Sequence, residues 1–291
     1  MMRMMLVAAA AAAIVAGVAG CQADNRNIER KLDEMSKDIK DLKQQVARGG
    51  AGAAAPRPQR AEPDRAKTYS MPVDNDPVDG PADAEVTLVK AYDYACPYCE
   101  KVRDTMDELR KKYGNDLRIV FKQFVVHPQQ ATAPALAVCA ANKQGKFLQM
   151  DQLLWDKGFK ARQFDKDATA EAGGQAQRCW ESAAGCPIVN GFAQELGLNV
   201  DKFKADMKGE CQAILQKDMR DLQVLGVGAT PSFFVNGRFM SGAMPIDNFV
   251  AIIDEELKKA NEKIAAGMSA ANYYQQVVVD KGLKTLEKPG Q

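Results

Sequence analysis

The stretch Ala91-Tyr92-Asp93-Tyr94-Ala95-Cys96-Pro97-Tyr98-Cys99-Glu100-Lys101 decides the fold. The apolar run Val86 to Val89 precedes it and a charged helical pattern follows, so two cysteines lie where a strand passes into a helix. Pro97 suits the first helical turn, because its missing N–H would have no partner there. Cys96 faces the positive end of the helix dipole, which favours a thiolate. A second sulfur, Cys99, completes what reversible disulfide exchange requires, so the pattern predicts a redox centre.

Two other interpretations of this cysteine pair stay open on the residues alone. A zinc site would need two more ligands, but the chain has no second CxxC motif and a single histidine, His127. A structural disulfide at this spacing is the other alternative. We expect no metal site.

The start of the chain has the pattern of an export signal. Residues 1–20 carry one cation, Arg3, then the apolar run Leu6 to Val18 and small residues, a core too short for a membrane span. The segment Val18-Ala19-Gly20-Cys21 resembles a bacterial lipobox, which implies cleavage before Cys21 and lipidation of that residue. An ordinary signal peptide is the alternative. We expect a periplasmic or otherwise extracytoplasmic protein, lipid-anchored to a bacterial membrane.

The number of cysteines fits this compartment. Seven cysteines are an odd count, and lipidation of Cys21 would leave the CxxC pair and four others. Four extra cysteines in an exported protein usually form two structural disulfides. Spacing does not fix the connectivity, and we favour the pairs Cys139–Cys211 and Cys179–Cys186. The formal net charge of +1 argues against a nucleic-acid partner, which would require a concentrated basic face.

Residues 21–48 predict a coiled-coil-like helix. Apolar residues from Ile28 to Val46 recur with the alternating spacing of a heptad seam. In a parallel dimer Asp38 would face Lys43, so we expect a homo-oligomer through Ile28–Val46, aided by membrane tethering. A single amphipathic helix on the membrane or on its own domain is the alternative. Residues 49–70, rich in Gly, Ala, Pro, Arg and Gln, predict a linker.

Residues 71–265 predict a catalytic domain of mixed α/β class. A strand at 86–89, a helix to about Tyr113 and a strand at 117–126 form a parallel crossover unit. Helical patterns then fill about 131–225, with helices expected at 133–144, 147–155, 187–196 and 200–225. A strand at 232–235, an Asn236-Gly237 turn and a helix at 246–264 follow. Residues 266–291 predict a short helix and a tail without chemistry.

The block Gly226 to Gly237, which contains Thr230-Pro231, together with the CxxC motif resembles the DsbA-type branch of the thioredoxin superfamily. The resemblance runs from about Pro72 to Ile264. It implies a thioredoxin-like fold with a helical insertion. It also implies a cis peptide bond before Pro231, placed beside the two sulfurs, and a client segment that pairs with the backbone near Thr230.

The resemblance also implies roles at the dithiol. Cys96 is the exposed nucleophile and Cys99 the buried resolving thiol, while Pro97 and Tyr98 tune the redox poise. Many members carry histidine in place of Tyr98. Lys90 stands where the family often has a buried acid, and as a cation it would favour the thiolate. The alternative is that Lys90 reaches solvent.

Three further side chains carry weaker expectations. Relatives often have a histidine near the position of His127, which implies a place close to the active face, although a plain loop histidine is the favoured interpretation. We expect Trp155 and Trp180 to be core residues.

These observations predict a thiol:disulfide oxidoreductase that acts on unfolded or cysteine-bearing client proteins, most simply as an oxidase. No cofactor beyond the Cys96–Cys99 disulfide is expected, and a membrane redox partner would recycle it. The alternatives are an oligomeric disulfide isomerase or reductase, and a non-enzymatic lipid-anchored adaptor that binds peptides.

Overall fold

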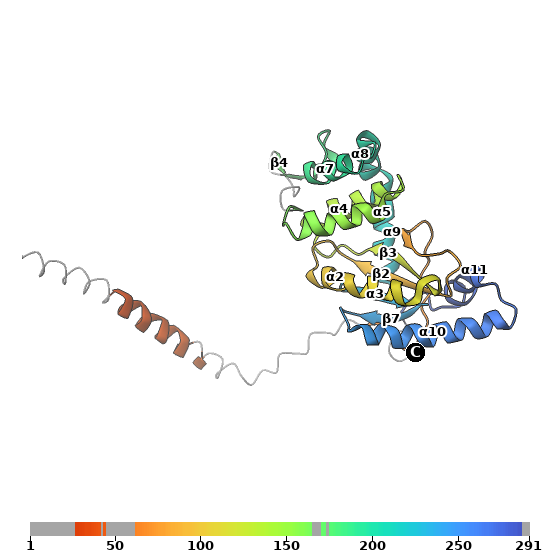
Figure 1. Cartoon of the computed structure of the whole chain (residues 1–291). Helices are drawn as coiled ribbons and strands as arrows, with labels where there is room; N and C mark the ends of the chain where they lie inside the picture. Colours follow the sequence, from red (N-terminus) through yellow and green to blue (C-terminus); the bar gives the residue numbers. More distant parts are fainter. Residues whose placement is uncertain (1–26, 42, 45–61, 165–169, 173–174, 287–291) are drawn as a thin grey trace, which may run out of the picture. The chain divides into compact units, whose positions relative to one another are not determined.

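A computed structural model of the chain describes residues 27–41, 43–44, 62–164, 170–172 and 175–286 (Figure 1). The chain divides into two units, Met1–Gln59 and Arg60–Gln291. The expected signal at 1–20, the lipidation site Cys21 and most of the expected linker lie outside the described residues.

The first unit is described only in its helical part. Residues 27–41 are helical, and four apolar side chains spaced by four, three and four residues are each more than half exposed: Ile28, Leu32, Met35 and Ile39. Leu42 and Val46 lie outside the description. In the part of the chain that the structure covers, no helix is both long and apolar enough to cross a membrane.

The second unit is built on a five-stranded sheet with the order β1-β3-β2-β6-β7. Strand β2 pairs in parallel with β3 and antiparallel with β6, while β1 and β7 lie antiparallel at the two edges. The bounds of the strands are Val78–Asp79 for β1, Val86–Tyr92 for β2, Leu117–Gln123 for β3, Ser232–Val235 for β6 and Arg238–Ser241 for β7.

The central strand β2 explains the two-sided core. All seven of its residues are buried. Because side chains alternate along a strand, Leu88 and Tyr92 pack into one hydrophobic cluster, and Val89 and Ala91 into another on the opposite face. Helices therefore cover both faces, as expected for a parallel strand pair.

The helices on the two faces are those that the topology requires. Helices α3 (Arg103–Tyr113) and α10 (Ile246–Ala265) contact each other and the sheet, while α9 (Glu210–Val224) contacts β3. Figure 1 shows α3 and α10 beside the sheet and a separate group of helices, α4, α5, α7 and α8, stacked beyond it.

That group is the expected helical insert. Its helices are α4 (Pro128–Asn142), α5 (Phe147–Leu153), α7 (Pro187–Glu195) and α8 (Val200–Lys208), with a π-helical segment at Leu154–Phe159 and a two-stranded ribbon, β4 (Ala170–Ala172) and β5 (Gln175–Gln177). The single helix expected at 200–225 is wrong: Gly209 separates α8 from α9, with a backbone φ of −108° and ψ of −106°.

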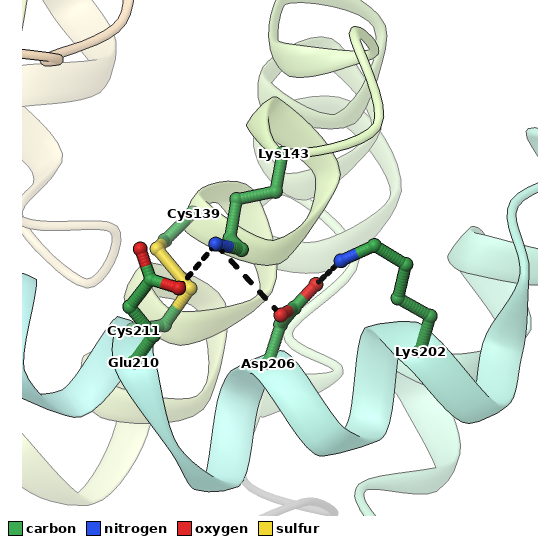
Figure 2. Close-up of a disulfide and its surroundings, with 6 residues drawn as sticks. All are labelled: Cys139, Lys143, Lys202, Asp206, Glu210 and Cys211. Carbon is green, nitrogen blue, oxygen red and sulfur yellow. Dashed lines mark hydrogen bonds and ion pairs between the residues drawn. A yellow bond between two sulfur atoms is a disulfide. The ribbon is translucent and has the colours of Figure 1, made fainter.

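Two disulfides hold the insert. Cys139 on α4 is joined to Cys211 on α9, and Cys179 is joined to Cys186, in the pairing favoured from the sequence. Figure 2 shows the first disulfide beside Lys143, which pairs with Glu210 and lies 3.9 Å from Asp206. Covalent and ionic contacts therefore tie α4 to α8 and α9.

A buried charged cluster ties the segment before β1 to β3 and α9. Lys122 Nζ lies 2.6 Å from an Asp76 oxygen, 3.0 Å from an Asp218 oxygen and 3.8 Å from an Asp221 oxygen. Asp218 also accepts a hydrogen bond from the Gln123 N–H at 3.0 Å. Both Asp76 and Asp218 side chains are at most 5% exposed, so one lysine faces two buried carboxyl groups.

Segments that come before and after the expected domain in the sequence also pack against it. The Ser70 N–H donates to the Leu283 carbonyl and the Leu283 N–H to the Thr68 carbonyl, each at 2.9 Å. Tyr69 is 2% exposed. The linker expected up to residue 70 therefore ends earlier, and the segment after residue 265 covers one face of the core, with Tyr274 donating a hydrogen bond to the Met71 carbonyl at 2.8 Å. Within that segment, α11 (Ala270–Tyr273) leads into a π-helical turn, Tyr274–Val279.

Candidate active site

The dithiol lies at the end of the central strand. β2 ends at Tyr92, and α2 (Pro97–Lys101) begins immediately after Cys96, with Pro97 in its first turn. The Cys99 and Glu100 N–H groups both donate to the Cys96 carbonyl, so Cys96 is the N-cap of this helix.

Asp93 fixes the loop between the strand and the dithiol. One carboxylate oxygen accepts from the Ala95 N–H at 2.6 Å, and the other from the N–H groups of Val126 and His127 at 2.6 and 2.8 Å. The Asp93 carbonyl in turn accepts from the Cys96 N–H at 3.1 Å. Sequence reasoning missed this residue, although an acid three positions before Cys96 was a visible signal for a loop cap. The same contacts end β3 at Gln123, short of the expected Val126.

The structure brings Cys96 and Thr230 together. The Cys96 thiol donates to the Thr230 carbonyl oxygen with a separation of 3.4 Å, and the Thr230–Pro231 peptide bond is cis. The hairpin that follows Pro231 is held against β2 by Asn236, whose side chain accepts from the Thr87 N–H at 2.9 Å and donates to the Glu85 carbonyl at 3.0 Å.

Both cysteines are buried, which corrects the expectation of an exposed nucleophile. Cys96 is 4% exposed and Cys99 is fully buried, because the Thr230 segment lies over the first sulfur. The two thiols therefore differ mainly in their pKa values and much less in their exposure. In the described residues these two are the free cysteines.

Hydrogen bonds lower the pKa of Cys96 to about 6 from an ordinary value of 9.0. The Cys99 thiol contributes most, the Thr230 side chain and the backbone N–H groups of Cys99 and Tyr98 add to it, and burial opposes the shift. The Thr230 carbonyl by itself can only accept from a thiol, so it does not favour the thiolate. Burial and the neighbouring Cys96 raise the pKa of Cys99 far above its ordinary value. The pair thus consists of one thiolate and one thiol near neutral pH.

The side chains of Pro97 and Tyr98 both face away from the sulfurs toward solvent. The Tyr98 side chain projects outward and is 62% exposed, and Pro97 is exposed too. Tyr98 acts on the pKa of Cys96 through its backbone N–H.

Lys90 is buried, so the alternative that it reaches solvent is wrong. It is 2% exposed, and its Nζ lies 4.9 Å from the centroid of the Tyr92 ring and 5.7 Å from that of Phe121. Burial lowers the pKa of Lys90, and the charges of Asp151 and Cys99 oppose the change. Its positive charge acts in return to lower the pKa of Cys99, so its electrostatic partner in the dithiol is Cys99 and not Cys96.

A polar network near this lysine joins the end of β2 to the insert. The Tyr94 hydroxyl donates to Asp151 at 2.6 Å and lies 3.1 Å from the Tyr92 hydroxyl, and the Trp155 indole N–H donates to Asp151 at 3.2 Å. Burial raises the pKa of the Asp151 carboxyl. Trp155 is fully buried, as expected, whereas Trp180 is only partly buried. No sequence signal marked Asp151, because it comes from a helix and lies 57 residues after Tyr94 in the chain.

His127 lies near the active face. Its ring Nδ1 is 3.2 Å from the Asp93 carboxylate, and its side chain is 48% exposed. It lines a hollow together with Ala95, the neighbour of Cys96. Within the described residues, no group of three or more His, Cys, Asp or Glu side chains is placed to hold a metal ion.

A protein-family model described as thioredoxin matches residues 73–255. The chain belongs to the thioredoxin family. Among solved structures, this thioredoxin-family chain is similar to oxidised BdbD from Bacillus subtilis, with 21% identity, coverage of 68% of this chain and 100% of that one, and a TM-score of 0.53. It is also similar to a variant of alpha-DsbA1 from Wolbachia pipientis, with 18% identity, 67% and 96% coverage and a TM-score of 0.52. The fold is thus thioredoxin-like.

Among curated proteins, the thioredoxin-family chain is 30% identical over 182 residues to the Na(+)/H(+) antiporter NhaA of Herminiimonas arsenicoxydans. The match covers 62% of this chain and 25% of that protein. The chain thus spans about a quarter of the length of such relatives.

Proposed function

We propose that the protein is an extracytoplasmic thiol:disulfide oxidoreductase that oxidises cysteine-bearing client proteins. The observation that carries the proposal is the contact of the acidic Cys96 thiol with the Thr230 carbonyl, next to the cis-proline and to the buried Cys99. A reactive sulfur, a resolving sulfur and a backbone segment that can pair with an extended client meet at one place.

The reaction follows from the different acidities of the two sulfurs. In the oxidised protein, a client thiolate attacks the Cys96 sulfur, the Cys96–Cys99 bond breaks, and the Cys99 sulfur takes up a proton. A second client thiolate then attacks the client sulfur of the mixed disulfide, which forms the client disulfide and releases the Cys96 thiolate. Since the pKa of Cys96 is about 6, this thiolate is a good leaving group, which favours client oxidation. A disulfide-bearing membrane partner would reoxidise the dithiol.

The proposal is tested by trapping and by the reduction potential. A Cys99→Ala variant should accumulate mixed disulfides with clients, and a Cys96→Ala/Cys99→Ala control should accumulate none. The reduction potential of the dithiol should be well above the roughly −270 mV of a reducing thioredoxin, near or above about −180 mV. If Cys99→Ala traps nothing, the non-enzymatic adaptor becomes the better explanation.

The compartment and anchor are part of the same proposal. The two disulfides in the insert, Cys139–Cys211 and Cys179–Cys186, suit an oxidising compartment. We propose lipidation at Cys21 on the basis of the sequence. Mass spectrometry of the membrane fraction from cells making wild type or Cys21→Ser checks it, because only the wild type should carry acyl chains and sediment with membranes.

The exposed apolar face of the first helix favours a second candidate, a disulfide isomerase that acts as an oligomer. Ile28, Leu32, Met35 and Ile39 are each 53–59% exposed, which suits burial against a second copy. Sedimentation of the full chain should show a Met35→Asp variant dissociating, while Lys37→Asp, which puts the same charge on the polar face, stays assembled. If the assembled wild type restores activity to a client with scrambled disulfides and the dissociated variant only oxidises, the isomerase gains support.

A further inference from the structure

A hollow of about 290 Å³ is formed mostly by the insert and is lined in part by Ala95, the residue before Cys96. We call it the Arg162 pocket, and it is lined by Ala95, His127, Gln130, Phe159, Arg162 and Phe164. Its volume is at the lower end of the roughly 300–1,000 Å³ of ligand pockets, which suits one client side chain better than a bulky cofactor. Thr230 and Pro231 are not among its lining residues, so it is separate from the backbone segment that would pair with the client.

The local backbone is specialised to form this pocket. The π-helical segment Leu154–Phe159 ends in a turn where Arg162 has a φ of +51°, a left-handed conformation that non-glycine residues seldom adopt. Gly158 lets the Phe164 ring pack directly against the backbone, because a Cβ at that position would lie 2.3 Å from the ring. Unusual backbone of this kind concentrates at functional sites.

Side-chain contacts fix the position of the pocket relative to the dithiol. Asp156 accepts from Arg103 on α3 at 3.1 Å, and Lys160 pairs with Glu100 on α2 at 3.2 Å. The aromatic ring of Phe159 packs against Trp155 with centroids 5.5 Å apart. These contacts fix the π-helical segment against the helix that carries Cys99, so a side chain in the pocket would belong to a client whose cysteine is close to Cys96.

The chemistry of the lining favours a carboxylate. Arg162 is exposed and offers a planar fork of donors that matches a carboxylate, Gln130 adds amide donors, and Phe159 and Phe164 provide an apolar wall for a methylene stem. Among the described residues that line the pocket, none is acidic. The Asp93 carboxylate, which contacts His127, is fully buried and already accepts from three backbone N–H groups.

We propose that the Arg162 pocket selects clients with an acidic side chain, glutamate or aspartate, within a few residues of the reacting cysteine. This inference rests on the proposed function, because it names the client preference of the same active site. The contact would accelerate formation of the mixed disulfide, as an exposed charge pair acts mainly on encounter and orientation.

The test measures attack on activated peptides by the full chain carrying Cys99→Ala. Each peptide holds one cysteine, activated as a mixed disulfide with a coloured aromatic thiol, and Glu, Gln or Lys at one of two positions on either side. Cys96 thiolate attacks the peptide sulfur, a Cys96–peptide disulfide forms, and the coloured thiolate leaves and is measured. At one or more positions we expect the Glu peptide to react about three to five times faster than the Lys peptide. This ratio should be smaller in 0.5 M salt.

Variants assign the preference to the pocket. Arg162→Ala should abolish the difference between Glu and Lys peptides, and Arg162→Glu should reverse it. Arg220→Ala removes another exposed arginine, one that lines a different hollow on α9, and should leave the preference unchanged. Equal rates for all peptides with the Cys99→Ala chain that keeps Arg162 would overturn this inference but not the proposed function. The same loss of the Glu preference in Arg162→Ala and Arg220→Ala would do so too. No reaction of Cys96 with any peptide would instead overturn the proposed function.

Discussion

The Cys96 thiol contacts the carbonyl oxygen of Thr230, which lies 134 residues further along the chain, at 3.4 Å. The sheet register produces this contact. Ala91 on β2 is paired with Ser232 on β6, so the residues just beyond that pair, at the end of β2 and before β6, meet at one edge of the sheet. The position of the reactive sulfur is therefore set by backbone pairing in the buried core.

The first prediction concerns the acidity of Cys96. In the reduced protein, alkylation by iodoacetamide should follow a titration with a midpoint at about pH 6. Since the Cys99 thiol is the largest cause of the lowered pKa, Cys99→Ala should move the midpoint up toward the ordinary value. A wild-type midpoint above pH 8 would contradict the hydrogen-bonding geometry.

The same lowered pKa fixes the pH dependence of the reduced fold. A cysteine whose pKa falls on folding stabilises the fold when its thiolate forms, so the gain is complete above about pH 9 and is lost as the pH falls through about 6. Urea unfolding of reduced wild type, compared with Cys96→Ser, should show the difference growing from pH 6 to pH 9.

The second prediction separates Lys90 from Cys96. Lys90→Met keeps the buried stem and removes the cation, so the pKa of Cys99 should rise further while the Cys96 midpoint stays in place. Closure of the mixed disulfide by Cys99 should slow by roughly three- to tenfold, which is up to one unit of pKa. Lys112→Met, an exposed lysine whose Nζ lies 5.6 Å from the Tyr113 ring centroid, is the matched control and should have no effect. A shifted Cys96 midpoint in Lys90→Met would reject this assignment.

The third prediction ranks the two structural disulfides. Removal of Cys139–Cys211, which are 72 residues apart, should lower the free energy of unfolding by about 4 kcal/mol, and removal of Cys179–Cys186, which are 7 apart, by about 2.5 kcal/mol. The larger loop loses more unfolded-state entropy when it is closed. Urea unfolding of the paired alanine variants gives both numbers. A larger loss for the short loop would show that chain entropy does not set the order.

The fourth prediction concerns the buried lysine cluster. Burial and the neighbouring Asp218 raise the pKa of Asp76 to about 7, despite Lys122. An acid with a raised pKa keeps its proton longer in the fold than in the unfolded chain, so the free energy of unfolding should fall as the pH rises from about 4 to about 7. Asp76→Asn should remove roughly 1–3 kcal/mol of this fall, measured by urea unfolding at both pH values. Asp221 lies 3.8 Å from the same lysine but is partly exposed, so Asp221→Asn should leave this dependence on pH unchanged.

The sequence predicted the parts of the fold that local pattern determines. The strand before the dithiol, Pro97 at the start of the helix and the Asn236-Gly237 turn depend on neighbouring residues, and each lies where it was expected. The φ angles of 43° and 82° in that turn are the left-handed pair that Asn-Gly prefers.

The rest depends on contacts between distant segments. The Asp93 carboxylate ends β3 early by accepting the N–H groups of Val126 and His127, and Lys90 is buried because aromatic rings from β2 and β3 surround its stem. Asp151 on α5 reaches the site through the hydrogen bond that it accepts from Tyr94, two residues before Cys96. Sequence periodicity carries no record of such pairings.

The backbone bonds between Thr68, Ser70 and Leu283 place the beginning and the end of the second unit side by side. A domain whose chain enters and leaves at neighbouring points can be circularly permuted. A short bridge after Leu286, leading back to Glu62, with a new opening at the Gly145 turn between α4 and α5, would preserve every strand of the sheet. The dithiol and its cis-proline would then occur in the reverse order along the polypeptide, and the active face should be built all the same.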